Sequence, residues 1–273
     1  MSMTLNIEAP TGACGQLDII PLACTFGIEV RGCDLSTPLS VDIAGTLRTL
    51  LAEHKLLVFR SNPGVGPHEL HRFSSIFGVP EEAEHPTHPN LPERPGVKLL
   101  ESNVTDLPAG APLVDTWHTD GATRASTRCV TALQAIDVPD LGRDTMFCDM
   151  EAVFEALSEP MKAFLSGKTA LHSWGRQKPD APPVEHPVVM TNPVNGRRAL
   201  YLNRLYTRSI VGLRQDESDA LLNLLLPLTH YPEHQLRVRW GLGDIVVWDN
   251  EMTQHYLVFD RAYPRVMHRC MMF

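Results

Sequence analysis

The sequence predicts an α+β chain that is mainly β, with a β-sandwich or open barrel buttressed by helices. Three observations predict this class. Strand-like segments are numerous and short, and helical periodicity is confined to a few stretches near the start and middle of the chain. The regular strand–helix alternation of a doubly wound parallel sheet is missing.

The first part of the chain alternates strands with two amphipathic helices. Residues 1–16 lack periodicity and are interpreted as a loose lead-in to a single domain over residues 17–273. A helix is indicated where Ile43, Leu47 and Leu50 recur at helical spacing. The elements expected here are strands at 17–22, 27–30 and 56–59 and helices at 41–53 and 67–77.

Residues 79–112 change character. They contain seven prolines together with several acidic and histidine residues. We interpret them as one long ordered loop, and loops of this length inside compact domains are commonly functional.

The rest of the chain returns to strands, interrupted by two helices. A hairpin turn is expected at Asn195-Gly196, because this dipeptide suits the tight turns that join antiparallel strands. The expected helices cover 150–165 and 216–226, a proline-rich loop covers 178–187, and the expected strands cover 127–136, 188–190, 199–202, 235–240, 245–248 and 265–272.

The composition excludes several classes of partner. The chain has 273 residues and a formal net charge of -8 without a Lys/Arg-rich run, so neither nucleic acid nor a membrane surface is an expected partner. The start lacks a basic segment followed by an apolar run, and the six cysteines are scattered without a C-x-x-C pair. We therefore expect a cytoplasmic protein, and we also expect a homo-oligomer, either a dimer or a tetramer.

The segment around His118 and Asp120 is the sharpest chemical feature. If it is extended, the two-residue period places both side chains on one face, where they can converge on one cation. His255, shortly after an expected strand, is the candidate third ligand. Two histidines and one carboxylate that leave the opposite positions open are typical of non-haem Fe(II) enzymes.

Arg265 and Arg269 suggest a place for anions. On a strand they point to the same face about 13 Å apart, so a carboxylate-bearing cosubstrate and an anionic substrate could each meet a guanidinium.

Together these features resemble the taurine dioxygenase and dichlorophenoxyacetate dioxygenase family of Fe(II)/2-oxoglutarate-dependent enzymes. The likeness covers roughly residues 17–269. It is carried, in the family's order, by EVRGCDL at 29–35, WHTD at 117–120, GRDT at 142–145, HPVV at 186–189, GRRALY at 196–201, GDIVVWDN at 243–250 with QHY at 254–256, and RVMHR at 265–269.

The resemblance implies a double-stranded β-helix, or jelly-roll, core and a defined set of site residues. Fe(II) would be held by His118, Asp120 and His255, and the distal carboxylate of 2-oxoglutarate by Thr145 and Arg265. The implied reaction uses O2 and couples decarboxylation of 2-oxoglutarate, to succinate and CO2, with hydroxylation or desaturation of a small to medium anionic substrate. That substrate would be a carboxylate or a sulfonate.

The implied substrate contacts are Arg269, His85 and Tyr206. His88 is a competing position for His85, since each histidine precedes a proline. Taurine itself is disfavoured because the stretch before Trp117 lacks an asparagine that the taurine enzyme uses. A second departure is Arg143, which stands where the family has the second glycine of Gly-Gly-Asp-Thr.

Other functions stay open at this point. The chain could be a tailoring oxygenase of a biosynthetic pathway, a non-catalytic jelly-roll binding protein, or a zinc hydrolase that uses the same three residues. Metal analysis and titration with 2-oxoglutarate would separate the last two from a dioxygenase.

Overall fold

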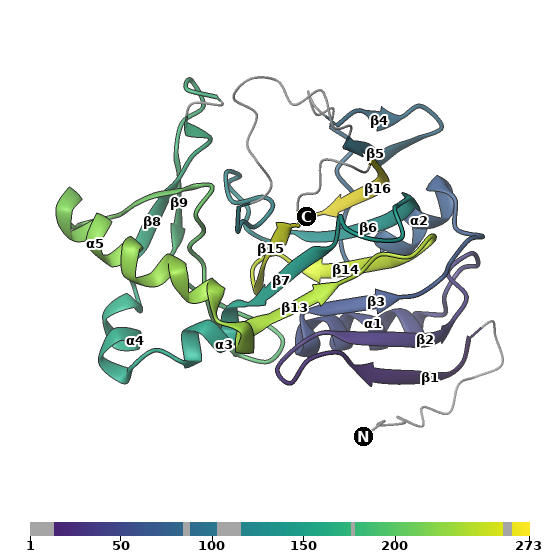
Figure 1. Ribbon diagram of the computed structural model, residues 1–273, viewed down its shortest axis with the longest axis horizontal. Coiled ribbons are helices and arrows are strands. Elements are labelled where there is room, and N and C mark those ends of the chain that lie inside the picture. Colours follow the sequence, from purple (N-terminus) through teal and green to yellow (C-terminus); the bar gives the residue numbers. More distant parts are fainter. Residues whose placement is uncertain (1–13, 84–87, 103–115, 176–177, 259–263) are drawn as a thin grey trace.

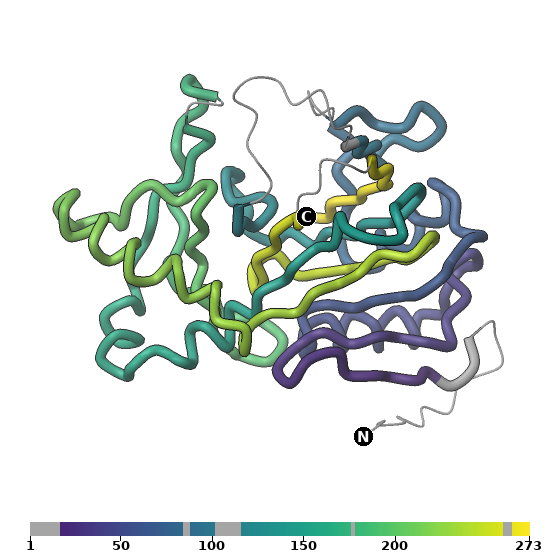
Figure 2. Tube along the Cα trace, in the orientation of Figure 1, coloured from purple at the N-terminus to yellow at the C-terminus, as the bar shows by residue number. Residues whose placement is uncertain are grey.

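The computed structural model describes residues 14–83, 88–102, 116–175, 178–258 and 264–273. Its largest sheet is mainly antiparallel. Figure 1 shows this sheet on the right, and Figure 2 traces it as a tube. Across the sheet the order is β1 (Cys14–Pro21), β2 (Ile28–Cys33), β3 (Leu56–Phe59), β14 (Ile245–Asp249), β6 (Val130–Asp137), β16 (Arg265–Met272), β5 (Arg94–Ser102) and β4 (Asn90–Leu91).

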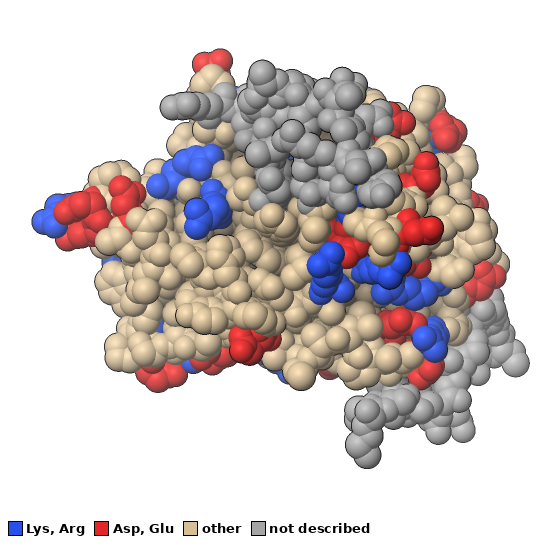
Figure 3. Space-filling model, in the orientation of Figure 1, with Lys and Arg blue, Asp and Glu red and all other residues tan. Residues whose placement is uncertain are grey.

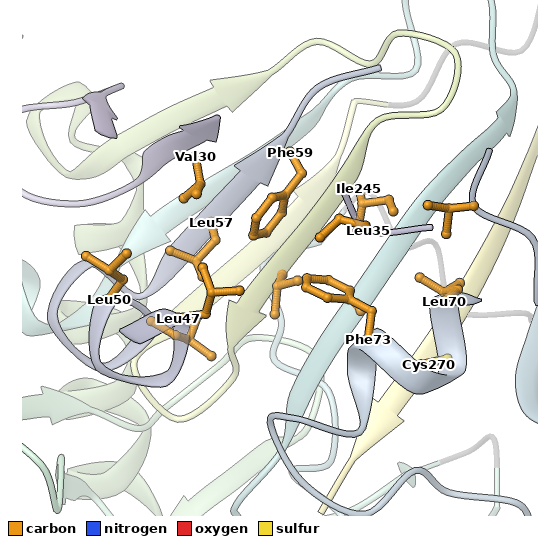
Figure 4. Packing of buried hydrophobic residues seen from close by; sticks show 14 of the residues in the cluster. Val30, Leu35, Leu47, Leu50, Leu57, Phe59, Leu70, Phe73, Ile245 and Cys270 are labelled. Carbon is orange, nitrogen blue, oxygen red and sulfur yellow. The ribbon is translucent and has the colours of Figure 1, made fainter. Parts of the chain in front are cut away.

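The two faces of this sheet have different coverings. Leu57 and Phe59 of β3 point to α1 (Val41–His54) and α2 (Pro67–Ser74) in the core shown in Figure 4, whereas Leu56 and Val58 belong to a second core. That second core also takes Phe147 and Val238 from a smaller sheet, ordered β13 (Gln235–Val238), β7 (Thr145–Asp149) and β15 (Thr253–Leu257). The chain is thus a two-layer β structure with helices on one outer face, as predicted.

The remaining elements form a separate group at one end of the sandwich, on the left in Figure 1. They pack around a third core that includes Trp117, Tyr201 and Tyr206. The group consists of a sheet ordered β12 (Thr207–Ile210), β8 (Thr169–His172) and β9 (Val184–Pro187), the predicted hairpin β10 (Val189–Thr191) and β11 (Arg198–Leu200), helices α3 (Met150–Glu155), α4 (Glu159–Leu165) and α5 (Gln215–Leu225), and the 3-10 turns η2 (Leu226–His230) and η3 (Pro232–His234). Within the described ranges, no helix has both the length and the apolar character needed to cross a membrane.

Three sequence predictions are wrong. The proline-rich loop expected over 178–187 ends in a strand, β9, at Val184–Pro187. Residues 79–112 are not one loop, because 94–102 form β5, whose residues pair with β16. The proline of this strand, Pro95, lies at its second position, where a missing N–H is tolerated.

The helix expected over 150–165 is two helices. Ala156 ends the first, and the second has an extended N-cap at Ser158 and Pro160 in its first turn, a place that suits proline better than a helix interior does.

The sequence also missed strands β7, β8, β9, β12 and β15. Each is short, and β15 is largely polar, so neither periodicity nor an apolar run marks it. Two of these strands, β7 and β15, carry residues of the candidate site.

A buried ion cluster joins the helical layer to the end group. Lys55 follows α1 in a left-handed conformation (φ 64°), and its Nζ lies 3.2 Å from Asp149 Oδ2 and 2.8 Å from Glu151 Oε2. The three side chains are nearly inaccessible to solvent. Asp149 also caps α3 by accepting hydrogen bonds from the backbone N–H groups of Glu151 and Ala152.

Replacing Lys55 tests this junction. Lys55→Met leaves Asp149 without its cation and Glu151 with only the more distant Arg197, at 3.9 Å, which should lower the free energy of unfolding by about 3–5 kcal/mol in urea titrations. The matched control is Arg214→Gln, because Arg214 forms ion pairs on the exposed surface and should lose less than about 1 kcal/mol. Equal losses of stability in the two variants would contradict the role of Lys55 as a buried, stabilising cation.

Candidate metal and cosubstrate site

Two segments far apart in the chain pair through their backbones and bring two histidines together. The N–H of His118 donates to the carbonyl of His255 at 3.1 Å, and the N–H of His255 donates back at 2.8 Å. Since His255 lies in the middle of β15, this bridge attaches the segment before β6 to the smaller sheet. The centres of the two imidazole rings are 4.1 Å apart.

Asp120 completes a group of three possible metal ligands. One ligand atom from each of His118, Asp120 and His255 can be chosen so that all lie within 4.8 Å of one another, and Asp120 Oδ1 is 3.9 Å from His255 Nε2. His118 Nδ1 lies 2.7 Å from the Thr116 carbonyl, so a proton on Nδ1 is donated there and Nε2 is left as a free lone pair. Asp120 itself opens a turn rather than continuing a strand.

Asn250 holds Asp120 in place through both ends of its amide. Its Oδ1 accepts from the Asp120 N–H and from Trp248 Nε1, each at 3.0 Å. Its Nδ2 donates to Thr131 Oγ1 at 2.9 Å, and that hydroxyl donates to Asp120 Oδ2 at 3.1 Å. The Thr119 hydroxyl donates to the carbonyl of Asn250. One carboxylate oxygen is thereby occupied, and the other faces His255.

Burial and neighbouring charges set the protonation of this group. Burial lowers the pKa of His118, and burial together with His118 lowers the pKa of His255 to about 3. Burial would raise the pKa of Asp120, but His255, Arg269 and His118 outweigh it and lower that pKa to about 2. At neutral pH the site therefore presents two neutral imidazoles and one carboxylate, the donor set that a divalent transition metal requires.

Thr145 and Arg265 lie on neighbouring parts of the same site. Thr145 begins β7, which pairs with β15, and its hydroxyl accepts a 3.0 Å hydrogen bond from Trp240 Nε1. Arg265 is 7% exposed, and its charge contributes to the lowered pKa of His255. Within the described residues its guanidinium has no carboxylate partner, and its Nε makes no hydrogen bond. A buried cation in that condition requires an anion.

Arg269 faces the three candidate ligands from the same strand. Residues 265–272 form β16, so the prediction that Arg265 and Arg269 share one face agrees with the extended backbone. The charge of Arg269 helps to lower the pKa of both Asp120 and His255. In the described part of the chain Arg269 forms no ion pair, and its buried Nε has no hydrogen-bond partner.

Tyr206 and Trp174 form an aromatic pair beside Asp120 and Arg269. Tyr206 is buried; burial raises the pKa of its hydroxyl, Asp120 adds to the increase, and Arg269 opposes it. The Trp174 ring lies edge-on to Tyr206, with centroids 5.3 Å apart, and Lys178 Nζ is 4.5 Å from the centre of the Trp174 ring. Sequence reasoning had identified Tyr206 but not Trp174, which follows β8, one of the strands it missed.

The structure does not decide which histidine of residues 79–112 is the substrate contact. His85 lies outside the described residues, and His88 is a half-buried residue just before β4. The choice between these two histidines as a substrate contact stays a prediction.

Comparisons with known proteins agree with this geometry. The family model described as "Taurine catabolism dioxygenase TauD, TfdA family" matches residues 18–271. The chain is 32% identical over 278 residues to the alkylsulfatase of Acinetobacter baylyi, covering 94% of this chain and 84% of that protein. It is 29% identical over 276 residues to an alpha-ketoglutarate-dependent sulfate ester dioxygenase of Pseudomonas putida, covering 93% and 88%.

A solved structure supports the fold as well. A putative alpha-ketoglutarate-dependent taurine dioxygenase from Burkholderia xenovorans superposes with a TM-score of 0.82 at 27% identity, covering 94% of this chain and 89% of that one. The family match spans nearly the whole chain, and the His-Asp-His group is the ligand set typical of non-haem Fe(II) oxygenases. The chain therefore belongs to the TauD/TfdA family: it is an Fe(II)- and 2-oxoglutarate-dependent dioxygenase with a jelly-roll core.

Proposed function

We propose that His118, Asp120 and His255 bind the Fe(II) ion of this dioxygenase and that Arg269 binds the anionic group of an organosulfur substrate. The observation that carries the proposal is the convergence of three ligand atoms within 4.8 Å beside the buried Arg265 and the half-buried Arg269, neither of which has a carboxylate partner in the described residues. Three protein ligands on one side of a metal leave positions for a cosubstrate and O2.

Thr145 and Arg265 are the proposed contacts of the distal carboxylate of 2-oxoglutarate. The guanidinium supplies a buried positive charge. Because the Thr145 oxygen already accepts from Trp240, its own hydrogen is free to be donated to a carboxylate.

With Fe(II), 2-oxoglutarate and O2 bound, the site couples oxidative decarboxylation, which yields succinate and CO2, to oxidation of a substrate C–H bond. The protein's own part is orientation. Asn250 and Thr131 hold Asp120 so that Oδ1 faces His255. Trp117 and Tyr256, whose rings are 5.6 Å apart, cover the His118–His255 bridge with apolar surface.

The proposed substrate is a sulfate ester or sulfonate with an apolar body. Arg269 can pair with the anionic head, while Tyr206 and Trp174 offer an aromatic wall to the carbon chain. Beyond that wall, Lys178 and Arg208 are exposed cations, which disfavour an ammonium group such as that of taurine. The names of the two curated relatives, an alkylsulfatase and a sulfate ester dioxygenase, support the sulfate ester.

The products follow from where the oxygen is placed. Hydroxylation of the carbon that bears the sulfate oxygen gives an unstable adduct. Its C–O bond to sulfate breaks as the hydroxyl proton leaves, and an aldehyde and inorganic sulfate are released. A carboxylate substrate, or desaturation in place of hydroxylation, would yield other products. These are the alternative outcomes of a substrate screen.

We also propose a cytoplasmic homo-oligomer, a dimer or tetramer, that binds neither nucleic acid nor membrane. The described cysteines, which include three buried residues, are free thiols, as a reducing compartment favours. On the face shown in Figure 3, basic and acidic side chains lie near one another. Among the described residues, Arg60 pairs with Asp244 and Arg237 with Asp144. Light scattering after gel filtration would test the assembly.

Loss of a ligand tests the metal site. His118→Ala should lower Fe(II) affinity by more than about 100-fold, since changes outside the ligand set already cost about 10–100-fold. Succinate release should disappear while the circular dichroism spectrum is retained. His230→Ala, which alters an exposed histidine, is the control. Unchanged iron content in His118→Ala would sink the assignment of His118 as a metal ligand.

Removing the Asn250 amide tests whether this side chain holds Asp120 in the metal site. Asn250→Ala should weaken Fe(II) binding about 10–100-fold, because Asp120 loses a hydrogen bond at its backbone and the partner of Thr131. Anaerobic Fe(II) titration measures this, with Asn195→Ala, in the β10–β11 turn, as the control. Equal iron affinities in the wild type and Asn250→Ala would contradict the role of Asn250 in holding Asp120.

Substrate recognition can be tested with a panel of matched anions. Alkyl sulfates of increasing chain length should stimulate succinate release more than taurine or the equivalent carboxylates. Arg269→Ala should raise the KM for the preferred sulfate about tenfold or more, as expected for one charge-assisted interaction, while 2-oxoglutarate affinity changes little. A preference for carboxylates would replace the organosulfur proposal.

A further inference from the structure

The turn that precedes Thr145 contains a second buried arginine. Arg143 is 1% exposed and has a φ of 57°, in the left-handed region that favours glycine. Its backbone conformation and its burial are both unfavourable for an arginine, and such costs are retained where a structure or a function requires them.

Arg143 lies directly against Arg265. The carbonyl of Arg143 accepts a 3.1 Å hydrogen bond from Arg265 Nη1. Burial lowers the pKa of Arg265 to about 10, and the charge of Arg143 adds to the decrease. Arg143 and the Arg265 guanidinium therefore share one buried region, and the positive charge of Arg143 makes that of Arg265 less favourable.

Among the described residues, the groups next to Arg265 do not neutralise it. Asp144, next along the chain, forms its ion pair with the exposed Arg237, at 2.5 Å. Thr145 and Trp240 contribute a hydroxyl and an indole N–H but no charge. An anion placed at Thr145 and Arg265 would relieve the repulsion between the two arginines as well as the burial of Arg265.

We propose that Arg143 is a cosubstrate-binding residue, a second guanidinium that attracts the distal carboxylate of 2-oxoglutarate alongside Arg265. This inference rests on the proposed cosubstrate site. It predicts selectivity for 2-oxo acids that carry a second carboxylate.

The test compares two 2-oxo acids that differ only in that carboxylate, namely 2-oxoglutarate and 2-oxopentanoate. Their dissociation constants are measured anaerobically on the Fe(II)-loaded protein by tryptophan fluorescence, to which Trp240 beside Thr145 contributes. The variants are Arg143→Gln and Arg143→Lys, which keep a side chain on the same backbone, and Arg143→Gly, which suits the left-handed φ.

Arg143→Gln and Arg143→Gly should weaken 2-oxoglutarate binding about tenfold, and Arg143→Lys less, because it keeps the charge. Binding of 2-oxopentanoate should stay within about twofold of the wild type in every variant. The control is Arg239→Gln, an exposed arginine that binds the carbonyl of Asp140 in the same turn, and it should leave both constants unchanged.

Two results would overturn the role of Arg143: equal 2-oxoglutarate affinity in the wild type and Arg143→Gln, or an equal loss for both 2-oxo acids, which would indicate a structural effect. If Arg143→Gln fails to fold, Arg143→Lys and Arg143→Gly carry the comparison. A wild type that binds no 2-oxoglutarate would instead overturn the proposed cosubstrate site itself.

Discussion

The geometry of the site depends on the hydrogen bonds of one buried amide. Asn250, directly after β14, reaches the Asp120 backbone directly and its carboxylate through Thr131. Strand β14 lies in the middle of the largest sheet, so Asp120 is attached to the centre of that sheet. His118, two residues earlier, is bound instead to β15 of the smaller sheet. The candidate metal ligands therefore lie where the two sheets meet.

Charge in this acidic protein is distributed so that the site is locally cationic. The chain carries a formal net charge of -8, yet Arg265 and Arg269 extend from β16 towards His255 and Asp120 without carboxylate partners among the described residues. His255 and Arg269 keep Asp120 ionised, and both arginines add to the burial that disfavours a proton on His255. The same field suits two anionic ligands, so metal binding and anion recognition depend on one arrangement of charges.

How much of this the sequence could predict differs from element to element. β3 and β16 were predicted with the bounds they have, because a compact apolar run and an alternating one are visible locally. The strand β5 was missed because prolines surround it and its partner β16 lies far along the chain. The break between α3 and α4 could have been read from Pro160, which fits the first turn of a helix. Trp174 carried no local signal, since only the fold places it against Tyr206.

The chemistry available to this protein is visible in the primary structure: the residue types at 118, 120, 255, 265 and 269, the order of the family's motifs, and a mainly β fold. These follow from side-chain identity and local periodicity, which are properties of neighbouring residues. Three contacts are visible only in the folded chain: Asn250 supports Asp120, Lys55 is buried between two carboxylates, and Arg143 lies beside Arg265. Such contacts join residues far apart in the chain, and their strength depends on burial, which exists only once the sheets have packed.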